Sequence, residues 1–432
     1  MRKMKKTTLD WVEQIPAEWE IKKLKYCFAF GKGLSITKDN LEESGISVIS
    51  YGQIHSKQNK GTAVHESLIR FVNESYLRTD ISALVRKNDF IFADTSEDLE
   101  GCGNCVYNDY DGKLFAGYHT IIFRSQQPDA KYFAYLFLTD CWRSQIRKVA
   151  SGVKLYSITQ KILKETSIII PPLPEQKKIA DFLDGKCADI DQIRADIEKQ
   201  IEILTDYKKS VIAEAVTKGL DPKAKMKDSG IEWIGQIPEH WSVDKLKFHL
   251  KFRGTKNPGD TIVLSLYREL GVVPKDSRDD NHNKTSEDTS NYRFVRNGDF
   301  VINKMKAWQG SVAVSDYEGI VSPAYYVYGF SDDLIFKRYF HYLLRDKSYA
   351  TEFKRLSGGI RVGQWDLPRE SLENTLILLP PISEQKEIAA YLNEKCSEIE
   401  ATIAEKQKQL ETLEEYKKSL IFEYVTGKKE VS

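Results

Sequence analysis

The sequence predicts an α+β protein with two similar mixed α/β domains and two long helices that pair as a coiled coil. Three observations support this fold class. The chain repeats itself, each repeat ends in a long uninterrupted helical pattern, and the segments between are rich in Tyr, Phe, Val and Ile. With 432 residues, 41% of them hydrophobic and 29% charged, the chain has an ordinary globular composition and the length for several domains.

The repeat extends over nearly the whole chain. DWVEQIPAEWEIKKLK (residues 10–25) recurs as EWIGQIPEHWSVDKLK (232–247), and VRKNDFIFADTSED (85–98) recurs as VRNGDFVINKMKAW (295–308). PPLPEQKKIADFLDGKCADIDQI (171–193) recurs as PPISEQKEIAAYLNEKCSEIEAT (380–402). We therefore expect five segments: a first domain (1–170), a first long helix (171–218), a linker (219–230), a second domain (231–379) and a second long helix (380–427).

The two long helices follow from the last of these repeats, which continues at the same offset of 209 residues to Thr217 and Thr426, and a glycine lies just after each, at 219 and 427. An inserted residue would turn the apolar face by about 100°, so constant length is typical of a continuous helix. Each helix is about 65 Å long at 1.5 Å per residue. The stripe expected to form the helix–helix contact contains Ile179, Leu183, Ile190, Ile197 and Leu204 in the first copy, and Ile388, Leu392, Ile399, Leu410 and Leu413 in the second. The alternative is that each helix packs only on its own domain.

Motifs of catalysis are missing from the sequence. It has no phosphate-binding loop, dinucleotide fingerprint, zinc-protease motif, nucleophile elbow or Asn-Pro-Pro-aromatic run. Cys102 and Cys105 form a C-x-x-C, and His119 could be a third ligand, but a fourth is missing, so we expect no metal site. Asp89 and Asp299 occupy matching positions, which we interpret as turn residues that enter a strand.

Charge and hydropathy limit the remaining classes. The net charge of +1 argues against a purely electrostatic nucleic-acid binder, although local basic surfaces remain compatible with it. No apolar run approaches the length of a membrane helix, and the N-terminus has no signal-peptide core, so we expect no membrane partner and a cytoplasmic location.

Several motifs resemble one family. These are Pro-Pro-x-x-Glu-Gln-Lys-x-Ile-Ala at the start of each long helix, Trp-x-x-x-x-Pro-x-x-Trp before each variable segment, and the phrases GDFVINKMKAWQG and YGQIHSKQ. In these the chain resembles the specificity subunit of type I restriction–modification enzymes. The resemblance implies two target-recognition domains in a pseudo-twofold arrangement, joined by the long helices running antiparallel.

The resemblance also implies a function without catalysis in this chain. Each domain would read one half of a bipartite, asymmetric DNA target, and the helical pair would set the spacer and dock the methyltransferase subunits. The implied partners are double-stranded DNA, two methyltransferase (modification) subunits and two restriction subunits. No cofactor is expected in this chain; S-adenosylmethionine, ATP and Mg would belong to the partner subunits.

The candidate DNA-reading side chains lie in loops that differ between the two copies. Arg suits guanine, Gln suits adenine and Glu suits the cytosine amino group in the major groove. The candidates are Gln53, His55, Thr95, Ser96, Glu97, Lys154 and Tyr156 in the first domain, and Lys304, Lys306, Trp308, Gln309, Arg361 and Gln364 in the second. Each could instead be a solvated loop residue, and Trp308 could pack in the core.

A second function class stays open. A non-catalytic coiled-coil scaffold or adaptor that binds only proteins would share the repeat and the missing motifs, but would show no salt-sensitive affinity for DNA. The sequence does not say which bases are read or how long the spacer is.

Overall fold

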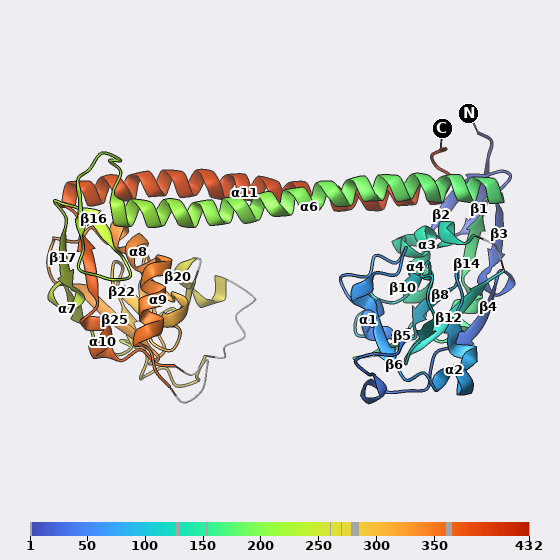
Figure 1. Ribbon diagram of the computed structural model, residues 1–432, viewed down its shortest axis with the longest axis horizontal. Coiled ribbons are helices and arrows are strands. Elements are labelled where there is room, and N and C mark those ends of the chain that lie inside the picture. The colour runs from blue at the N-terminus through green and yellow to red at the C-terminus, as the bar shows by residue number, and fades with distance from the viewer. Residues whose placement is uncertain are drawn as a thin grey trace. The chain divides into compact units, whose positions relative to one another are not determined.

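The computed structural model describes residues 2–126, 129–152, 154–259, 261–268, 270–277, 285–359 and 365–431. The chain divides into two compact units (Figure 1). Unit 1 comprises Met1–Asp196 and Gln409–Ser432, and unit 2 comprises Ile197–Lys408. Each unit therefore contains one domain and a segment of both long helices, α6 (Leu173–Lys218) and α11 (Ile382–Val425).

The domain of unit 1 is a mixed α/β structure. Its strands are β1 (Met4–Leu9), β2 (Val12–Pro16), β3 (Glu20–Lys23), β4 (Phe28–Lys32), β5 (Ile46–Ile49), β6 (Arg70–Val72), β7 (Leu84–Val85), β8 (Phe90–Ala93), β9 (Thr95–Ser96), β10 (Cys105–Tyr107), β11 (Leu114–Ala116), β12 (Thr120–Ser125), β13 (Tyr156–Ser157) and β14 (Ser167–Ile170). Its helices are α1 (Tyr51–Ile54), α2 (Tyr76–Thr79), α3 (Lys131–Leu138), α4 (Asp140–Arg147) and α5 (Gln160–Glu165).

The domain of unit 2 has a similar set of elements. Its strands are β15 (Met226–Asp228), β16 (Gln236–Pro238), β17 (Ser242–Lys245), β18 (Leu250–Phe252), β19 (Leu264–Tyr267), β20 (Gly271–Pro274), β21 (Arg293–Val295), β22 (Phe300–Asn303), β23 (Val312–Val314), β24 (Gly319–Val321), β25 (Tyr325–Phe330) and β26 (Leu376–Leu379). Its helices are α7 (Leu246–His249), α8 (Lys337–Arg345), α9 (Lys347–Leu356) and α10 (Arg369–Glu373).

The repeat in sequence is also a repeat in sheet topology. The four-stranded antiparallel sheet of unit 1 has the order β10-β8-β12-β4, and that of unit 2 has the corresponding order β23-β22-β25-β18. The pairs β1–β2 and β3–β14 recur as β15–β16 and β17–β26. Unit 1 also has a second four-stranded sheet, β6-β5-β11-β7, in which β5 and β11 are parallel. The predicted fold class, two similar mixed α/β domains with two long helices, is confirmed.

The long helices run antiparallel within each unit. In unit 1, Ile179 and Leu183 of α6 share a core with Leu420 and Val425 at the end of α11. In unit 2, the start of α11 shares a core with the end of α6. Of the residues predicted for the stripe, Ile179, Leu183, Ile190, Ile197, Ile388, Leu392 and Ile399 are buried, and Leu204, Leu410 and Leu413 are partly buried. Because several of them pack into a domain core as well, the stripe serves both kinds of contact that the sequence left open.

One tyrosine in each unit ties a strand to the end of a helix. The buried Tyr132 hydroxyl lies 2.8 Å from the carbonyl of Val425 and 3.2 Å from that of Ile169. Its counterpart Tyr339 reaches two carbonyls at 3.3 Å, one at the end of α6 and one on β26. Each tyrosine thus joins the strand that precedes one long helix to the end of the other long helix.

The Trp-x-x-x-x-Pro-x-x-Trp segment of each domain packs against these helix ends. Gly427 has φ +70°, and a Cβ atom there would lie 2.5 Å from the ring of Pro16 and 3.1 Å from Trp19. Trp19 is buried and its indole nitrogen donates to Glu175 at the start of α6, at 2.9 Å. In unit 2, Gly219 lies in the same way against Trp241.

The linker contains a short strand that the sequence did not predict. Residues 219–230 include β15, whose Met226 pairs with Pro238 of β16. The three residues of β15 are all exposed, so hydrophobic periodicity gives no signal for this strand, which backbone pairing defines instead.

Two buried carboxylates hold the turns that enter β8 and β22. Asp89 accepts from the backbone nitrogens of Arg86 at 2.9 Å and Ser125 at 3.2 Å, and Asp299 accepts from that of Arg296 at 3.0 Å. Burial raises the pKa of both carboxyl groups. Their structural role as turn residues agrees with the interpretation from sequence.

The guanidinium beside each carboxylate comes from a different strand in the two domains. Arg124 of β12 lies 3.1 Å from Asp89, whereas Arg253, directly after β18, lies 3.1 Å from Asp299. β12 corresponds to β25, where Gly329 takes the place of Arg124 and a Cβ atom would lie 2.4 Å from the Arg253 guanidinium. The two domains thus keep one ion pair by reciprocal exchange of Arg and Gly.

Candidate nucleic-acid interface

The structure brings the candidate residues of the first domain together from three segments. β9, with Thr95 and Ser96, pairs with β13, in which Tyr156 faces Ser96. The ring of His55, which follows α1, lies 2.8 Å from the Thr95 carbonyl through Nε2. The segments around residues 53–55, 95–97 and 154–156 therefore form one surface.

These candidates differ in what their side chains are free to do. Glu97 and Lys154 are exposed. The side-chain amide oxygen of Gln53 accepts from the backbone nitrogen of Ser50 at 3.1 Å, which caps α1. Ser96 is buried, and both ring nitrogens of His55 have partners, Thr95 and Asn104. Glu97 and Lys154 are thus better placed than Ser96 or His55 to contact a ligand.

The second domain brings the corresponding loops together. Lys304 forms an ion pair with Asp366 at 3.0 Å, and the backbone nitrogen of Leu367 donates to the Lys304 carbonyl at 3.0 Å. The indoles of Trp308 and Trp365 lie 5.6 Å apart. The segments 304–309 and 365–367 therefore lie side by side.

The other second-domain candidates have separate environments. Lys306 is exposed, and Gln309 accepts from Arg268 at 3.2 Å. Trp308 is partly buried, and its indole nitrogen donates to the carbonyl of Met305 at 3.1 Å. Arg361 and Gln364 lie outside the described residues.

An aromatic group beside the first-domain surface escaped the sequence analysis. Tyr51 lies within 5.4–5.6 Å of the rings of Tyr118 and His119. His119 has the left-handed backbone angle φ 54°, which is rare outside glycine, and its Nδ1 lies 3.2 Å from Asp94. The segment YGQIH pointed to this place, but His119 lies 64 residues after His55 and only the fold brings it there.

Apolar side chains at the loop tips also went unnoticed. Leu99, Leu155 and Met305 are among the exposed large hydrophobic residues, each in or beside a candidate loop. In DNA-binding proteins such side chains contact thymine methyl groups or wedge between bases. Leu99 and Met305 each lie between two charged residues in a loop, which was the signal available in the sequence.

In the second domain, two arginines stack on aromatic side chains of β18 and β25. The guanidinium carbons of Arg369 and Arg293 lie 4.3 Å and 5.2 Å from the ring centre of Phe252, and Arg293 lies 5.7 Å from that of Tyr326. Such stacking fixes the direction of cations that can bind phosphate.

The described part of the chain offers no metal centre. No group of three or more His, Cys, Asp or Glu among these residues could hold an ion. Burial raises the pKa of Cys105 to about 12 and raises that of Cys102 as well, which favours thiols over the thiolates that metals bind. None of the described helices is both long enough and apolar enough to cross a membrane.

Two similar domains with one frame and different loops, on two long helices, define a protein built from two copies of a recognition module. A family model agrees: it is described as the type I restriction modification DNA specificity domain and matches residues 16–203 and 248–413. The chain belongs to this family, and it is a specificity subunit of a type I restriction–modification system.

Individual relatives agree over most of the chain. It is 26% identical to the putative type I restriction enzyme MjaX specificity subunit of Methanocaldococcus jannaschii, over 96% of this chain and 95% of that one. It is 28% identical to the MjaVIII specificity subunit of the same organism, over 66% and 67% of the two chains. The resemblance stated from sequence is confirmed.

Solved structures share the fold. A chain from a study of complex assembly and conformational transition of the type I system matches with a TM-score of 0.68 and 16% identity, covering 96% of this chain and 99% of that one. The HsdS subunit from Thermoanaerobacter tengcongensis matches with a TM-score of 0.53 and 17% identity, covering 98% of this chain and 100% of that one.

Proposed function

We propose that each domain reads one half of a bipartite, asymmetric DNA target. The observation that carries the proposal is that the two domains share a sheet order and differ in the loops where the candidate residues gather. A shared frame presents both loop sets in the same way, and different loops give different half-sites. Exposed Glu97 would accept from a cytosine amino group, and exposed Lys306 would donate to guanine.

The two long helices would set the spacer between the half-sites. α6 has 46 residues and α11 has 44, each without interruption. Ion pairs link the two helices within both units, through Arg194 and Glu414 in unit 1 and Lys208 and Glu400 in unit 2. A continuous paired helix resists bending, so its length would fix the spacer.

The chain itself would catalyse nothing. Two modification subunits would dock on the helical pair and methylate adenine with S-adenosylmethionine, and two restriction subunits would supply ATP- and Mg-dependent cleavage. The repeated helical frame supports two copies of each partner, because equivalent surfaces recur at positions 209 residues apart.

The test uses the chain co-expressed with the modification subunit from its own genome. We expect adenine methylation of a random DNA library to give a split motif with two different halves and a fixed gap. Glu97→Ala should weaken discrimination in one half and Lys306→Ala in the other, each by about 1–3 kcal/mol at one base pair. A continuous motif, or none, would contradict the proposal and favour a scaffold that binds only proteins.

A further inference from the structure

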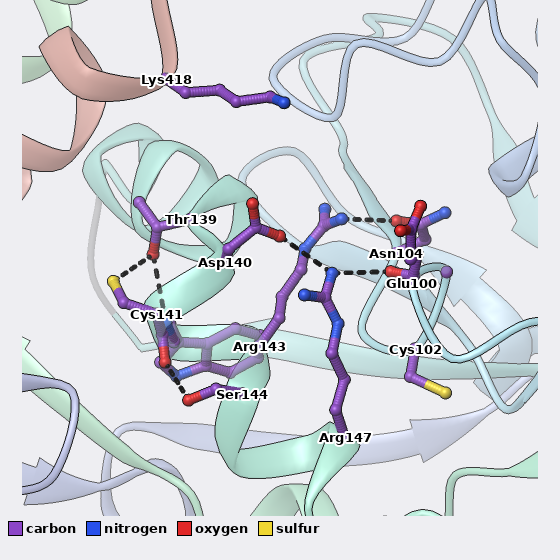
Figure 2. A network of polar contacts seen from close by, with 12 residues as sticks. Glu100, Cys102, Asn104, Thr139, Asp140, Cys141, Arg143, Ser144, Arg147 and Lys418 are labelled. Atoms are coloured by element: carbon purple, nitrogen blue, oxygen red, sulfur yellow. Dashed lines mark hydrogen bonds and ion pairs between the residues drawn. The ribbon is translucent and has the colours of Figure 1, made fainter. Parts of the chain in front are cut away.

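The loop between β8 and β10, residues 94–104, is held from beneath by two arginines of α4 (Figure 2). Arg143 donates through Nη1 to the side-chain oxygen of Asn104 at 2.7 Å and through Nε to the Phe137 carbonyl at 2.7 Å. Arg147 donates to the Glu100 carbonyl at 2.8 Å and pairs with Asp140 at 2.9 Å. The loop is therefore fixed at both Glu100 and Asn104.

The Arg143 contact determines the protonation pattern of His55. A guanidinium only donates, so the Asn104 atom that faces Arg143 is the oxygen, and its amide nitrogen faces His55 Nδ1 at 3.1 Å. That nitrogen donates, so Nδ1 accepts and carries no proton. The proton of the neutral ring is then on Nε2, which donates to the Thr95 carbonyl at 2.8 Å.

Close packing keeps this arrangement in place. A Cβ atom at position 101 would lie 3.0 Å from His55 Nδ1 and 2.5 Å from the Ser96 hydroxyl, so Gly101 lets the loop close on the ring. Thr95, the last member of the chain of hydrogen bonds, belongs to β9 and pairs with Ser157. The position of β9 and of the adjoining Glu97 thus depends on Asn104 and Arg143.

The second domain shares the sheet order of the first but not the residues that form this series of hydrogen bonds. The backbone nitrogen of Ala93 donates to the backbone carbonyl of Asn104 at 3.1 Å. In the second domain the backbone nitrogen of Asn303 donates in the same way to the carbonyl of Ser311 at 3.0 Å, so Ser311 corresponds to Asn104. In α9 the buried Tyr349 corresponds to Trp142, so the residue equivalent to Arg143 is Ala350. The shared sheet order recurs in both domains, whereas the hydrogen bonds among Arg143, Asn104 and His55 belong to the part of the first domain that differs from the second.

We propose that Arg143, Asn104 and His55 form a positioning relay that sets the base-reading loop of the first domain, and that His55 itself contacts no base. The inference rests on the proposed reading of a split DNA target. It replaces the expectation from sequence that His55 reads DNA, because both of its ring nitrogens are already used.

The first test uses ¹⁵N NMR to determine which ring nitrogen of His55 carries the proton. In the full chain labelled with ¹⁵N-histidine, and with His55→Gln to assign its signals, we expect an unprotonated Nδ1 and a protonated Nε2. Asn104→Asp is nearly isosteric and its carboxylate accepts from both neighbours, so Nδ1 of His55 should then carry a proton. A wild-type ring protonated at Nδ1 alone would overturn the relay.

The second test measures specificity in the complex with the modification subunit. Asn104→Leu and Arg143→Met should each lower discrimination in the first half-site by about tenfold or more and leave the second half-site unchanged. Asn104→Asp should retain discrimination, which separates the relay from a general packing defect. Lys306→Ala is the matched variant, with its loss confined to the second half-site.

The outcomes separate the two levels of the argument. Undiminished first-half discrimination in Asn104→Leu, with a normal split motif in the wild type, would overturn the relay alone. Loss in both halves would show a general defect and would also overturn it. A wild type without a split motif would refute the proposed function, and with it the role of the relay in reading.

Discussion

The reciprocal exchange of Arg and Gly makes a sharp prediction about stability. In the first domain the guanidinium beside Asp89 comes from Arg124, and Gly31 occupies the place that Arg253 has in the second domain. We expect Arg124→Gly to destabilise the first domain and Gly31→Arg to restore part of the loss. Gly31 has room for a side chain, since its nearest neighbour to an added Cβ is Ile122 at 3.4 Å.

The magnitude follows from the surroundings of Asp89. Removing one partner of a buried ion pair costs about 3–5 kcal/mol. The Asp89 side chain is only 3% exposed, but it keeps two backbone donors, and Arg124 is 19% exposed. These reduce the expected loss to about 2–3 kcal/mol. The second substitution should return about half of it, because a new arginine must be ordered at the site.

The double-mutant cycle separates this interaction from general effects. Gly31→Arg alone places two guanidinium groups at one carboxylate and should destabilise, so its effect should change sign between the two backgrounds. Arg124→Ala with Gly31→Arg is a matched control. At the equivalent position of the second domain a Cβ atom would meet the guanidinium at 2.4 Å, so rescue should be weaker with Ala than with Gly.

Hydrogen exchange is the suitable assay, because a chain with two compact units need not unfold in one step. The amides of β8 and β12 report the first domain, and those of β22 and β25 serve as an internal reference. If Gly31→Arg has the same effect in the wild-type background as in the Arg124→Gly background, the two guanidinium positions are not equivalent and the reasoning fails.

Three further predictions concern the frame and the second domain. Trp19→Phe removes the hydrogen bond to Glu175 and should cost about 1.5–3 kcal/mol, measured by local hydrogen exchange at the start of α6; a loss below about 0.5 kcal/mol would contradict it. Gly427→Ala should destabilise by about 1–3 kcal/mol, since φ is +70° and the new Cβ meets Pro16, whereas Gly230→Ala, at φ +71° with open space around it, should cost less; equal thermal shifts would refute the packing argument. Burial and the neighbouring Arg345 and Arg338 lower the pKa of His341 to about 3, so the folded state binds fewer protons than the unfolded state between pH 6.5 and 3. Stability should therefore decrease as the pH is lowered through that window, by up to about 1.4 kcal/mol per pH unit. His341→Gln should reduce the pH dependence of the urea midpoints measured from pH 7.5 to 5. An unchanged slope would rule out His341 as the source of that dependence.

The frame could be predicted from sequence because it is written twice with little change in length. Tyr132 and Tyr339, Asp89 and Asp299, and the two Trp-Pro-Trp segments each make the same kind of contact in both units. A long helix also announces itself through a regular apolar pattern. The short exposed strand β15 carries no such pattern, so its residues fall within the linker that the sequence predicts.

The candidate nucleic-acid interface could be predicted only in outline. Comparing two copies position by position identifies loops that differ, but it does not show which side chains within them are already bonded. His55 and Asn104 are 49 residues apart in sequence and meet only because α1 packs beside β8. The exchange between Arg124 and Arg253 escapes the same comparison, since the guanidinium keeps its place in space while its residue moves to a neighbouring strand.

The end of the second helix shows why the repeat must be understood in space as well as along the chain. The carbonyl of Val425 completes the hydrogen bonds of Tyr132, 293 residues earlier, as Val216 does for Tyr339. The first domain therefore takes the last turn of α11 into its core, and the second takes the last turn of α6. The core of each domain includes residues from the other repeat. Because each domain is closed by the end of a helix that belongs to the other repeat, its loops can change without changing how those helix ends are held.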